Sequence, residues 1–130
     1  REVFGTLCAT CHRLGGLGQE VGPDLVAVAG HPPEKLLTNI LDPSADVQPG
    51  YQAYHCELAD GTEIYGVIAS ETGSSLIFKL ADGSARIVRR QDIRELRSAN
   101  VSLMPDGLEA GLTLQSAADL LSFLREPGVR

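Results

Sequence analysis

The sequence predicts a mainly α-helical core that carries a small antiparallel β unit inserted at about residues 51–97, so that the chain is α+β overall. Three observations lead to this prediction. Apolar residues recur at helical spacing towards both ends of the chain, alternation replaces that spacing after Pro49-Gly50, and Asp-Gly pairs divide the alternating stretch into hairpins. The length fits a single domain over residues 1–130, and 43% hydrophobic with 22% charged residues is typical of a globular chain.

Three helices are expected, over residues 2–13, from Pro33 to just before Pro43, and after Thr113. Proline is tolerated in the first turn of a helix and disfavours a helical residue ahead of it, so the two prolines fit a start and a stop. Threonine is a good N-cap, which fits the third start. The apolar residues at helical spacing are Val3, Phe4, Leu7, Cys8 and Cys11, then Leu36, Leu37, Ile40 and Leu41, then Ala117, Leu120, Leu121 and Leu124.

Four strands are expected in the alternating region, which is rich in Tyr, Ile, Val and Leu. Asp60-Gly61 and Asp82-Gly83 predict tight hairpins, because both residues of such a turn accept positive φ. Thr72-Gly73 predicts the turn between these hairpins, and a linker near Ser98–Asn100 is expected to lead back to the helical part. The expected strands are residues 51–58, 62–69, 74–80 and 84–90.

The charge and hydropathy of the chain exclude some partners. The formal net charge is −6, and an acidic chain lacks the clustered Lys and Arg that bind nucleic acid phosphates. No apolar run approaches the roughly 20 residues of a membrane-spanning helix, so direct membrane insertion is not expected. The negative charge fits a partner protein that presents a basic docking patch.

The most informative motif is Cys8-Ala9-Thr10-Cys11-His12, which has the C-x-x-C-H spacing of c-type haem attachment. Residues three and four apart share a helix face, so both thiols and the imidazole can point at one flat ligand. The thiols would add to two porphyrin vinyl groups, and His12 would be the proximal iron ligand.

Three other interpretations of this motif are weaker. A thioredoxin-like redox pair would follow a strand, and none is expected before residue 8. A pure disulfide framework would leave one of the three cysteines over. A zinc site would need a second ligand pair, and only scattered candidates remain, namely His31, His55 and Cys56.

Met104, the only methionine, is the candidate for the distal iron ligand. Pro105 biases Met104 towards an extended conformation, which suits a strap across the second face of the porphyrin. A thioether ligand favours Fe(II) and raises the reduction potential relative to a second histidine. The alternatives are a methionine that fills a gap in the core, with His31 or His55 as the ligand instead.

In the order and context of its motifs, the chain resembles a class I cytochrome c with a helical core. It is most similar to the C-terminal haem-binding domain of large planctomycete and verrucomicrobial proteins. The resemblance covers essentially the whole chain, including the β unit. The residues that carry it are Cys8-Ala9-Thr10-Cys11-His12-Arg13-Leu14, Gly22-Pro23-Asp24-Leu25, Leu41-Asp42-Pro43-Ser44, Pro49-Gly50-Tyr51 and Ser102-Leu103-Met104-Pro105-Asp106-Gly107-Leu108.

This resemblance implies a one-electron carrier, not itself an enzyme, with one covalent haem c ligated by His12 and Met104. It also implies that the carbonyl of Pro23 accepts a hydrogen bond from Nδ1 of His12, which would fix the tautomer of the ring. The location implied is periplasmic or otherwise extracytoplasmic, and the electron donor is a redox partner protein or a fused dehydrogenase domain of a larger oxidoreductase. Two other functions stay open, a haem-based gas sensor with a weak sixth ligand and an interaction module whose working surface is the β unit.

Several further residues have open roles. Cys56 on an expected strand is interpreted as a buried thiol, with an intermolecular disulfide dimer as the alternative. A basic stretch in this acidic chain is interpreted as a solvated strand face, with haem propionates or an electron donor as alternative partners. Two tyrosines either bind a propionate or fill the core of the β unit. The basic stretch is Arg86, Arg89 and Arg90, and the tyrosines are Tyr51 and Tyr54.

Overall fold

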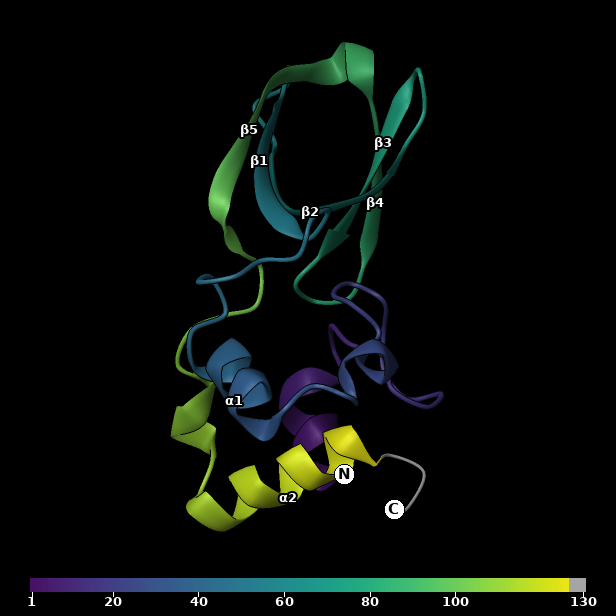
Figure 1. Cartoon of the computed structure of the whole chain (residues 1–130). Coiled ribbons are helices and arrows are strands. Elements are labelled where there is room, and N and C mark those ends of the chain that lie inside the picture. The colour runs from purple at the N-terminus through teal and green to yellow at the C-terminus, as the bar shows by residue number, and fades with distance from the viewer. Residues whose placement is uncertain (127–130) are drawn as a thin grey trace.

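The computed structural model describes residues 1–126, in which a five-stranded antiparallel sheet lies beside a group of short helices (Figure 1). The last four residues of the predicted domain 1–130 lie outside the described part. Helices of all kinds and strands each account for 31% of the described residues. The fold is therefore α+β, and the prediction of a mainly α-helical cytochrome core is wrong.

The sheet contains one strand more than the sequence predicted. Its strands are β1 (Gln52–Leu58), β2 (Glu63–Glu71), β3 (Ser75–Leu80), β4 (Ala85–Arg89) and β5 (Ile93–Ser102), in the spatial order β4-β3-β2-β1-β5. The first four agree with the expected strands to within two residues. β5 replaces the expected linker at 98–100 and pairs with β1, with Tyr54 opposite Ser98 and Cys56 opposite Leu96. Its pairing partner lies about 40 residues earlier, so no local signal marked it.

Two hairpins of the sheet turn at the expected Asp-Gly pairs. Gly61 and Gly83 have φ of 88° and 87°, a left-handed conformation that glycine adopts without strain. In each turn the aspartate accepts a backbone hydrogen bond two residues on, from Thr62 to Asp60 at 2.9 Å and from Ser84 to Asp82 at 2.8 Å. The two turns are thus built in the same way.

The two α-helices are α1 (Pro33–Leu41) and α2 (Leu114–Arg125), as the sequence predicted. Thr113 caps α2 in a capping box, in which its hydroxyl accepts from the backbone of Ser116 at 3.0 Å. The expected helix 2–13 is shorter. A π-helix covers Phe4–Cys8, and turns follow it. Short 3₁₀ segments cover Leu25–Val28, Arg90–Asp92 and Leu108–Gly111.

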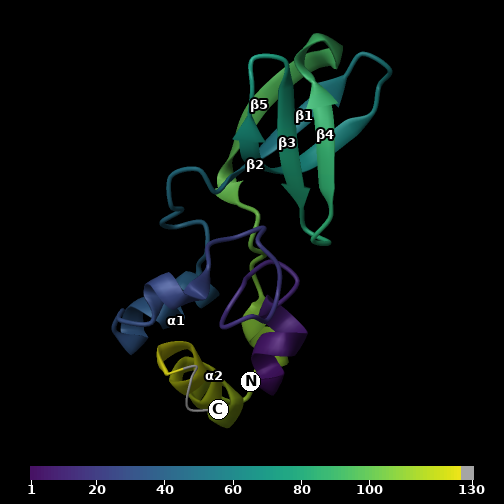
Figure 2. The same cartoon turned by 90° about the vertical axis from the view of Figure 1, so that its right-hand side faces the viewer.

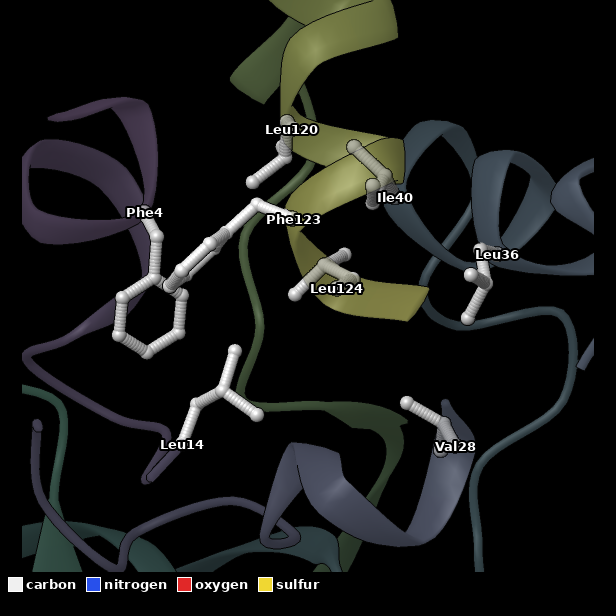
Figure 3. Close-up of a cluster of buried hydrophobic side chains, with 8 residues drawn as sticks. All are labelled: Phe4, Leu14, Val28, Leu36, Ile40, Leu120, Phe123 and Leu124. Carbon is white, nitrogen blue, oxygen red and sulfur yellow. The ribbon is translucent and has the colours of Figure 1, made fainter. Parts of the chain in front are cut away.

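The molecule has two separate apolar cores. We call residues 51–102 the sheet half and residues 1–50 with 103–126 the helical half. The helical core joins the first helix to α1 and α2, with the rings of Phe4 and Phe123 5.7 Å apart (Figure 3). Its buried members are Phe4, Leu14, Val28, Leu36, Ile40, Leu120, Phe123 and Leu124. The core of the sheet half consists of Cys56, Ile64, Leu76, Phe78 and Val88.

The two halves meet at the chain crossings and at one hairpin. Figures 1 and 2 both show the tip of the β3–β4 hairpin pointing towards the loop that follows the first helix. Near the crossings, the backbone amide of Ser102 donates to the hydroxyl of Ser44 at 3.1 Å. No helix within residues 1–126 is both long enough and apolar enough to cross a membrane.

Candidate functional site

A large cleft lies between the loop after the first helix, α1 with the segment behind it, and the segment after β5. Its empty volume is about 1150 Å³, including the space at its open mouth. Most of the lining side chains are apolar, and Val67 of β2 closes one side from the sheet half. The aliphatic members of this lining are Leu7, Val21, Leu25, Val28, Leu36, Ile40, Val47, Val67, Leu103, Leu108 and Leu124.

Cys8, Cys11 and His12 all line this cleft. Cys8 ends the π-helix, and its carbonyl accepts from the backbone amides of Cys11 at 3.1 Å and of His12 at 2.9 Å. These bonds continue the helical path for one more turn. The following loop folds back over it, because the amides of Val21 and Gly22 both donate to the carbonyl of Cys11, at 2.9 and 2.7 Å. The motif is therefore held by backbone bonds on both sides.

The imidazole of His12 has a fixed tautomer. Nδ1 lies 2.8 Å from the carbonyl oxygen of Pro23, and since a carbonyl can only accept, Nδ1 carries the proton and Nε2 keeps its lone pair. Burial lowers the pKa of His12, against the opposing effect of the Pro23 hydrogen bond. Gly22 allows the close packing of the ring, because a Cβ there would lie 2.6 Å from Cε1. A neutral imidazole with a free Nε2 is the form that ligates a metal.

The two thiols are free and protonated at neutral pH. Burial, with a smaller contribution from Cys11, raises the pKa of Cys8 to about 11, and burial also raises the pKa of Cys11. Within residues 1–126, no three His, Cys, Asp or Glu side chains gather closely enough to hold a metal ion.

Met104 reaches the same cleft from the segment after β5. Its side chain is half-buried and packs against the helical core. The Ser102 hydroxyl accepts from the Met104 amide at 3.1 Å, and Ser102 is itself tied to Ser44. The segment before Pro105 is therefore anchored to the chain behind α1. The structure brings together every site residue that the sequence singled out, namely Cys8, Cys11, His12, Pro23 and Met104.

Several secondary candidates lie elsewhere. Arg89 at the end of β4 pairs with Asp92 at 3.3 Å, and Arg90 in the following 3₁₀ segment pairs with Glu71 at 3.1 Å, so both are exposed surface residues and only Arg89 lies on a strand. Neither they nor Arg86 line the cleft. The ring of His55 packs on Tyr65 with centroids 4.6 Å apart, and His31 is also absent from the lining.

The two tyrosines and Cys56, whose roles the sequence left open, lie at different places in the fold. Tyr51 lines the cleft, whereas Tyr54 packs against the core of the sheet half. Cys56 is 1% exposed, which confirms that it is a buried thiol. A disulfide between two copies would require the sheet to open, so the alternative of a Cys56-linked dimer is not supported.

The sequence did not reveal one group of lining residues. The polar side chains of Asn39, Asp46, Gln48 and Ser102 line the cleft, together with Val67 from the sheet. All of them except Asn39 and Val67 lie in irregular segments or at a strand end, where periodicity gives no direction. Asn39 lies three residues after Leu36 on the apolar side of α1, and a polar residue at that spacing is a usable signal.

No protein-family model matches the chain, and no curated protein matches it to a significant degree.

Proposed function

We propose that this chain is an electron-transfer domain with one haem c, attached through Cys8 and Cys11 and ligated by His12 and Met104. The observation that carries the proposal is that one apolar cleft is lined by both cysteines, the imidazole and the only methionine of the chain. The chemical types and their order along the chain are those of covalent attachment and His/Met ligation.

The cleft residues fit the group. The lining is mostly apolar, as a porphyrin face requires, and Gly22 leaves room for the His12 ring against the backbone. Each cysteine would add its S–H across one vinyl group, so that one S–C bond forms and the hydrogen goes to the terminal vinyl carbon. No oxidant or reductant is consumed in this addition. When bound, the group supplies a reversible one-electron couple between Fe(II) and Fe(III).

The residues of the chain have distinct tasks in this proposal. The hydrogen bond to Pro23 holds the His12 ring in one orientation and makes Nε2 a stronger donor towards iron. Met104 supplies a soft sulfur that favours the reduced state. The apolar walls exclude water, and a low-dielectric surrounding disfavours the additional positive charge of the oxidised state. All these effects raise the reduction potential, except the His12 basicity, which opposes them.

The proposal extends to the surroundings of the domain. We infer an extracytoplasmic location, because the resemblance to haem c domains implies it. A redox protein or a fused dehydrogenase domain would supply the electrons. The charge of −6 supports a partner with a basic contact surface.

The first experiment tests covalent attachment. The chain is produced together with a haem-ligation machinery, and the pigment is measured as a pyridine haemochrome after extraction with acidified organic solvent. Colour that stays with the protein supports the proposal, and the Cys8→Ala/Cys11→Ala variant is expected to lose it. Colourless protein, or pigment that the solvent removes from the wild type, contradicts it.

The second experiment tests the axial methionine and discriminates against a gas sensor. We expect Met104→Ala to lower the reduction potential, to remove the red sulfur-to-iron absorption band and to open the reduced iron to carbon monoxide. Leu103→Ala is the matched control, since Leu103 also lines the cleft but has no ligand atom. If the reduced wild type binds carbon monoxide as readily as Met104→Ala, the sixth position is open and sensing becomes the better proposal.

A further inference from the structure

The turn between β3 and β4 reaches the second cysteine of the attachment motif. The thiol of Cys11 donates to the carbonyl oxygen of Ala81 at 3.5 Å, across 70 residues of sequence. Figures 1 and 2 show this hairpin tip directed at the loop that contains the cysteine. Within residues 1–126, the Cys8 thiol of the same motif makes no such hydrogen bond with the sheet half.

The turn is a rigid element. The Leu80 amide donates to the Ser84 carbonyl, and the Gly83 amide donates to the Leu80 carbonyl, both at 2.9 Å. Asp82 accepts from the amide and the hydroxyl of Ser84, at 2.8 and 2.6 Å. Four hydrogen bonds within five residues fix the direction of the neighbouring Ala81 carbonyl.

The turn is also fitted against the loop. Gly83 has no side chain, and a Cβ built on it would lie 2.7 Å from the carboxamide of Gln19. The backbone of Gln19 is held in turn, because its backbone amide donates to the carbonyl of Ala9 at 3.0 Å. The hairpin tip thus packs at Gly83 directly against a side chain of the loop around the attachment motif, without a side chain of its own in between.

The chain contains a natural control for this contact. The β1–β2 turn has the same Asp-Gly pair, the same aspartate bond and the same left-handed glycine, but a Cβ on Gly61 would meet nothing within 4 Å. The turn chemistry is therefore common to both hairpins, and only the β3–β4 turn uses it to contact the helical half.

We propose that the β3–β4 turn positions and covers the second attachment sulfur. The Ala81 carbonyl holds the Cys11 thiol in one rotamer at the wall of the cleft, and Gly83 closes the turn against Gln19, so that the turn shields one side of that half-buried sulfur from solvent and reagents. The covering half of this inference stands on the contact alone. The positioning half rests on the proposed function, because it concerns attachment to haem.

The first test measures the protection of each thiol in the folded, haem-free protein. A thiol reagent is applied under native conditions, and fragmentation mass spectrometry quantifies the label on Cys8, Cys11 and Cys56 separately. Gly83→Val crowds the contact with Gln19 at the first side-chain carbon, and Gly61→Val introduces the same backbone strain without a neighbour.

We expect Gly83→Val to raise the labelling rate of Cys11 about 10-fold, since a β-branched residue at positive φ that also meets a neighbour displaces the tip. Cys8 and Cys56 are expected to stay at the wild-type rate, and Gly61→Val is expected to leave Cys11 unchanged. Equal Cys11 labelling in the two glycine variants and in the wild type overturns the cover.

A second variant distinguishes a local displacement of the turn from unfolding of the sheet. If Gly83→Val also exposes Cys56, the Gln19→Ala variant decides, because it removes the packing partner without changing the sheet half. More Cys11 label in Gln19→Ala with protected Cys56 supports the cover, and wild-type labelling in that variant overturns it.

The second test separates this inference from the proposed function. The same variants are produced with the ligation machinery, and mass spectrometry counts molecules that carry haem through Cys8 alone, with Cys11 free. We expect this single-bonded fraction to rise in Gly83→Val and not in Gly61→Val. Complete double attachment in both variants overturns the positioning role. Absence of haem from every variant, the wild type included, contradicts the proposed function and leaves the thiol-protection result valid by itself.

Discussion

The sheet half and the helical half differ in how much of their apolar surface is covered by their own side chains. In the sheet half, five strands form a continuous hydrogen-bonded ladder over one apolar core. In the helical half, the core of eight residues lies beside a cleft of about 1150 Å³, and much of the backbone around that cleft is irregular. The first region is closed by its own contacts, and the second has an apolar wall that the rest of residues 1–126 leaves uncovered.

The two halves also differ in their net charge and in how many of their charged residues form ion pairs. The sheet half has six Lys or Arg and seven Asp or Glu, and the rest of the chain has five and ten, so the net charges are −1 and −5. Among residues 1–126, four of the five ion pairs lie in the sheet half. Neither Asp42 nor Asp106, which flank the cleft-lining prolines 43 and 105, takes part in one of these pairs. The negative charge is thus concentrated in the helical half, and one of its carboxylates, Asp46, lies in the lining of the cleft.

This difference indicates a division of tasks. A self-contained sheet is a stable frame, and a half with an open apolar cleft gains stability from the group that fills it. Perturbing each half separately, with a matched change in the other, tests whether the two halves have these separate tasks.

If the chain binds haem as proposed, removal of the haem should affect one half far more than the other, and this is the largest effect that we expect. In the Cys8→Ala/Cys11→Ala variant, amide hydrogen exchange in α1 and α2 should accelerate by orders of magnitude, because the cleft walls lose the group that they bury. Exchange in β1, β2 and β3 should stay within a few-fold of the haem-bound wild type. Uniform acceleration in both halves would show that they form one cooperative unit.

Removal of one aromatic ring from each core should lower the stability of the two halves by similar amounts, but only one of the two changes should alter the haem absorption spectrum. Phe78→Ala and Phe123→Ala each remove a ring that is at most 1% exposed, and each is expected to lower the free energy of unfolding by about 3–5 kcal/mol. Only Phe123→Ala should perturb the haem absorption bands, as it packs beside the cleft wall. Equal spectral changes in both variants would contradict the separation of the cores.

Neutralising carboxylates should slow electron exchange only when the carboxylates lie near the cleft. We expect Asp42→Asn/Asp106→Asn to slow reduction by a cationic reagent roughly two- to threefold at low salt, because the local field attracts it less. Glu57→Gln/Glu95→Gln is the control in the sheet half, where both carboxylates have arginine partners. The effect of the cleft variant should vanish at high ionic strength, and a salt-independent effect would rule out steering.

The smallest expected effect is an acid-dependent loss in the sheet half. Hydrogen bonds from Thr62 and Ser84 lower the pKa of Asp60 and Asp82 below the ordinary value of 3.8. A carboxyl whose pKa is lower in the folded state stabilises the fold above its ordinary pKa, and that contribution is lost as the pH falls through the lowered value. Asp60→Asn/Asp82→Asn should therefore flatten the stability of the sheet half below about pH 4. Unfolding by urea, followed between about pH 2 and 6, measures this change; an unaltered pH profile would contradict it.

The sequence predicted the elements whose signals are local. Asp60-Gly61 and Asp82-Gly83 each determine a hairpin within a few residues, and Thr113 marks the start of α2. The motif and the methionine could likewise be identified as candidates from residue type and order alone. The strand β5 could not, because its side chains are mostly exposed and do not alternate, and it is stabilised by pairing with β1 far back in the chain.

The error in fold class has the same cause. The sequence predicts a linker near Ser98–Asn100 and no strand after residue 90, whereas the chain forms the ten residues of β5 there. The helix expected at 2–13 ends at Cys8, and the glycine-rich backbone after it folds back over the motif. The first difference adds strand and the second removes helix, so the chain contains more strand and less helix than the sequence predicts. The contact between Ala81 and Cys11 depends on how the finished sheet is placed, so no pattern in either segment predicts it.

The pairing of Gln52 with Ser102 has a consequence for protein engineering. The chain enters and leaves the sheet at neighbouring positions, about 5 Å apart between Cα atoms as opposite residues of an antiparallel pair are. For the remaining 78 residues of the chain, the five-stranded unit therefore bridges no greater distance than a short loop would. A unit with such adjacent ends can be exchanged, enlarged or replaced by a few residues without a change in the distance that the host backbone must span.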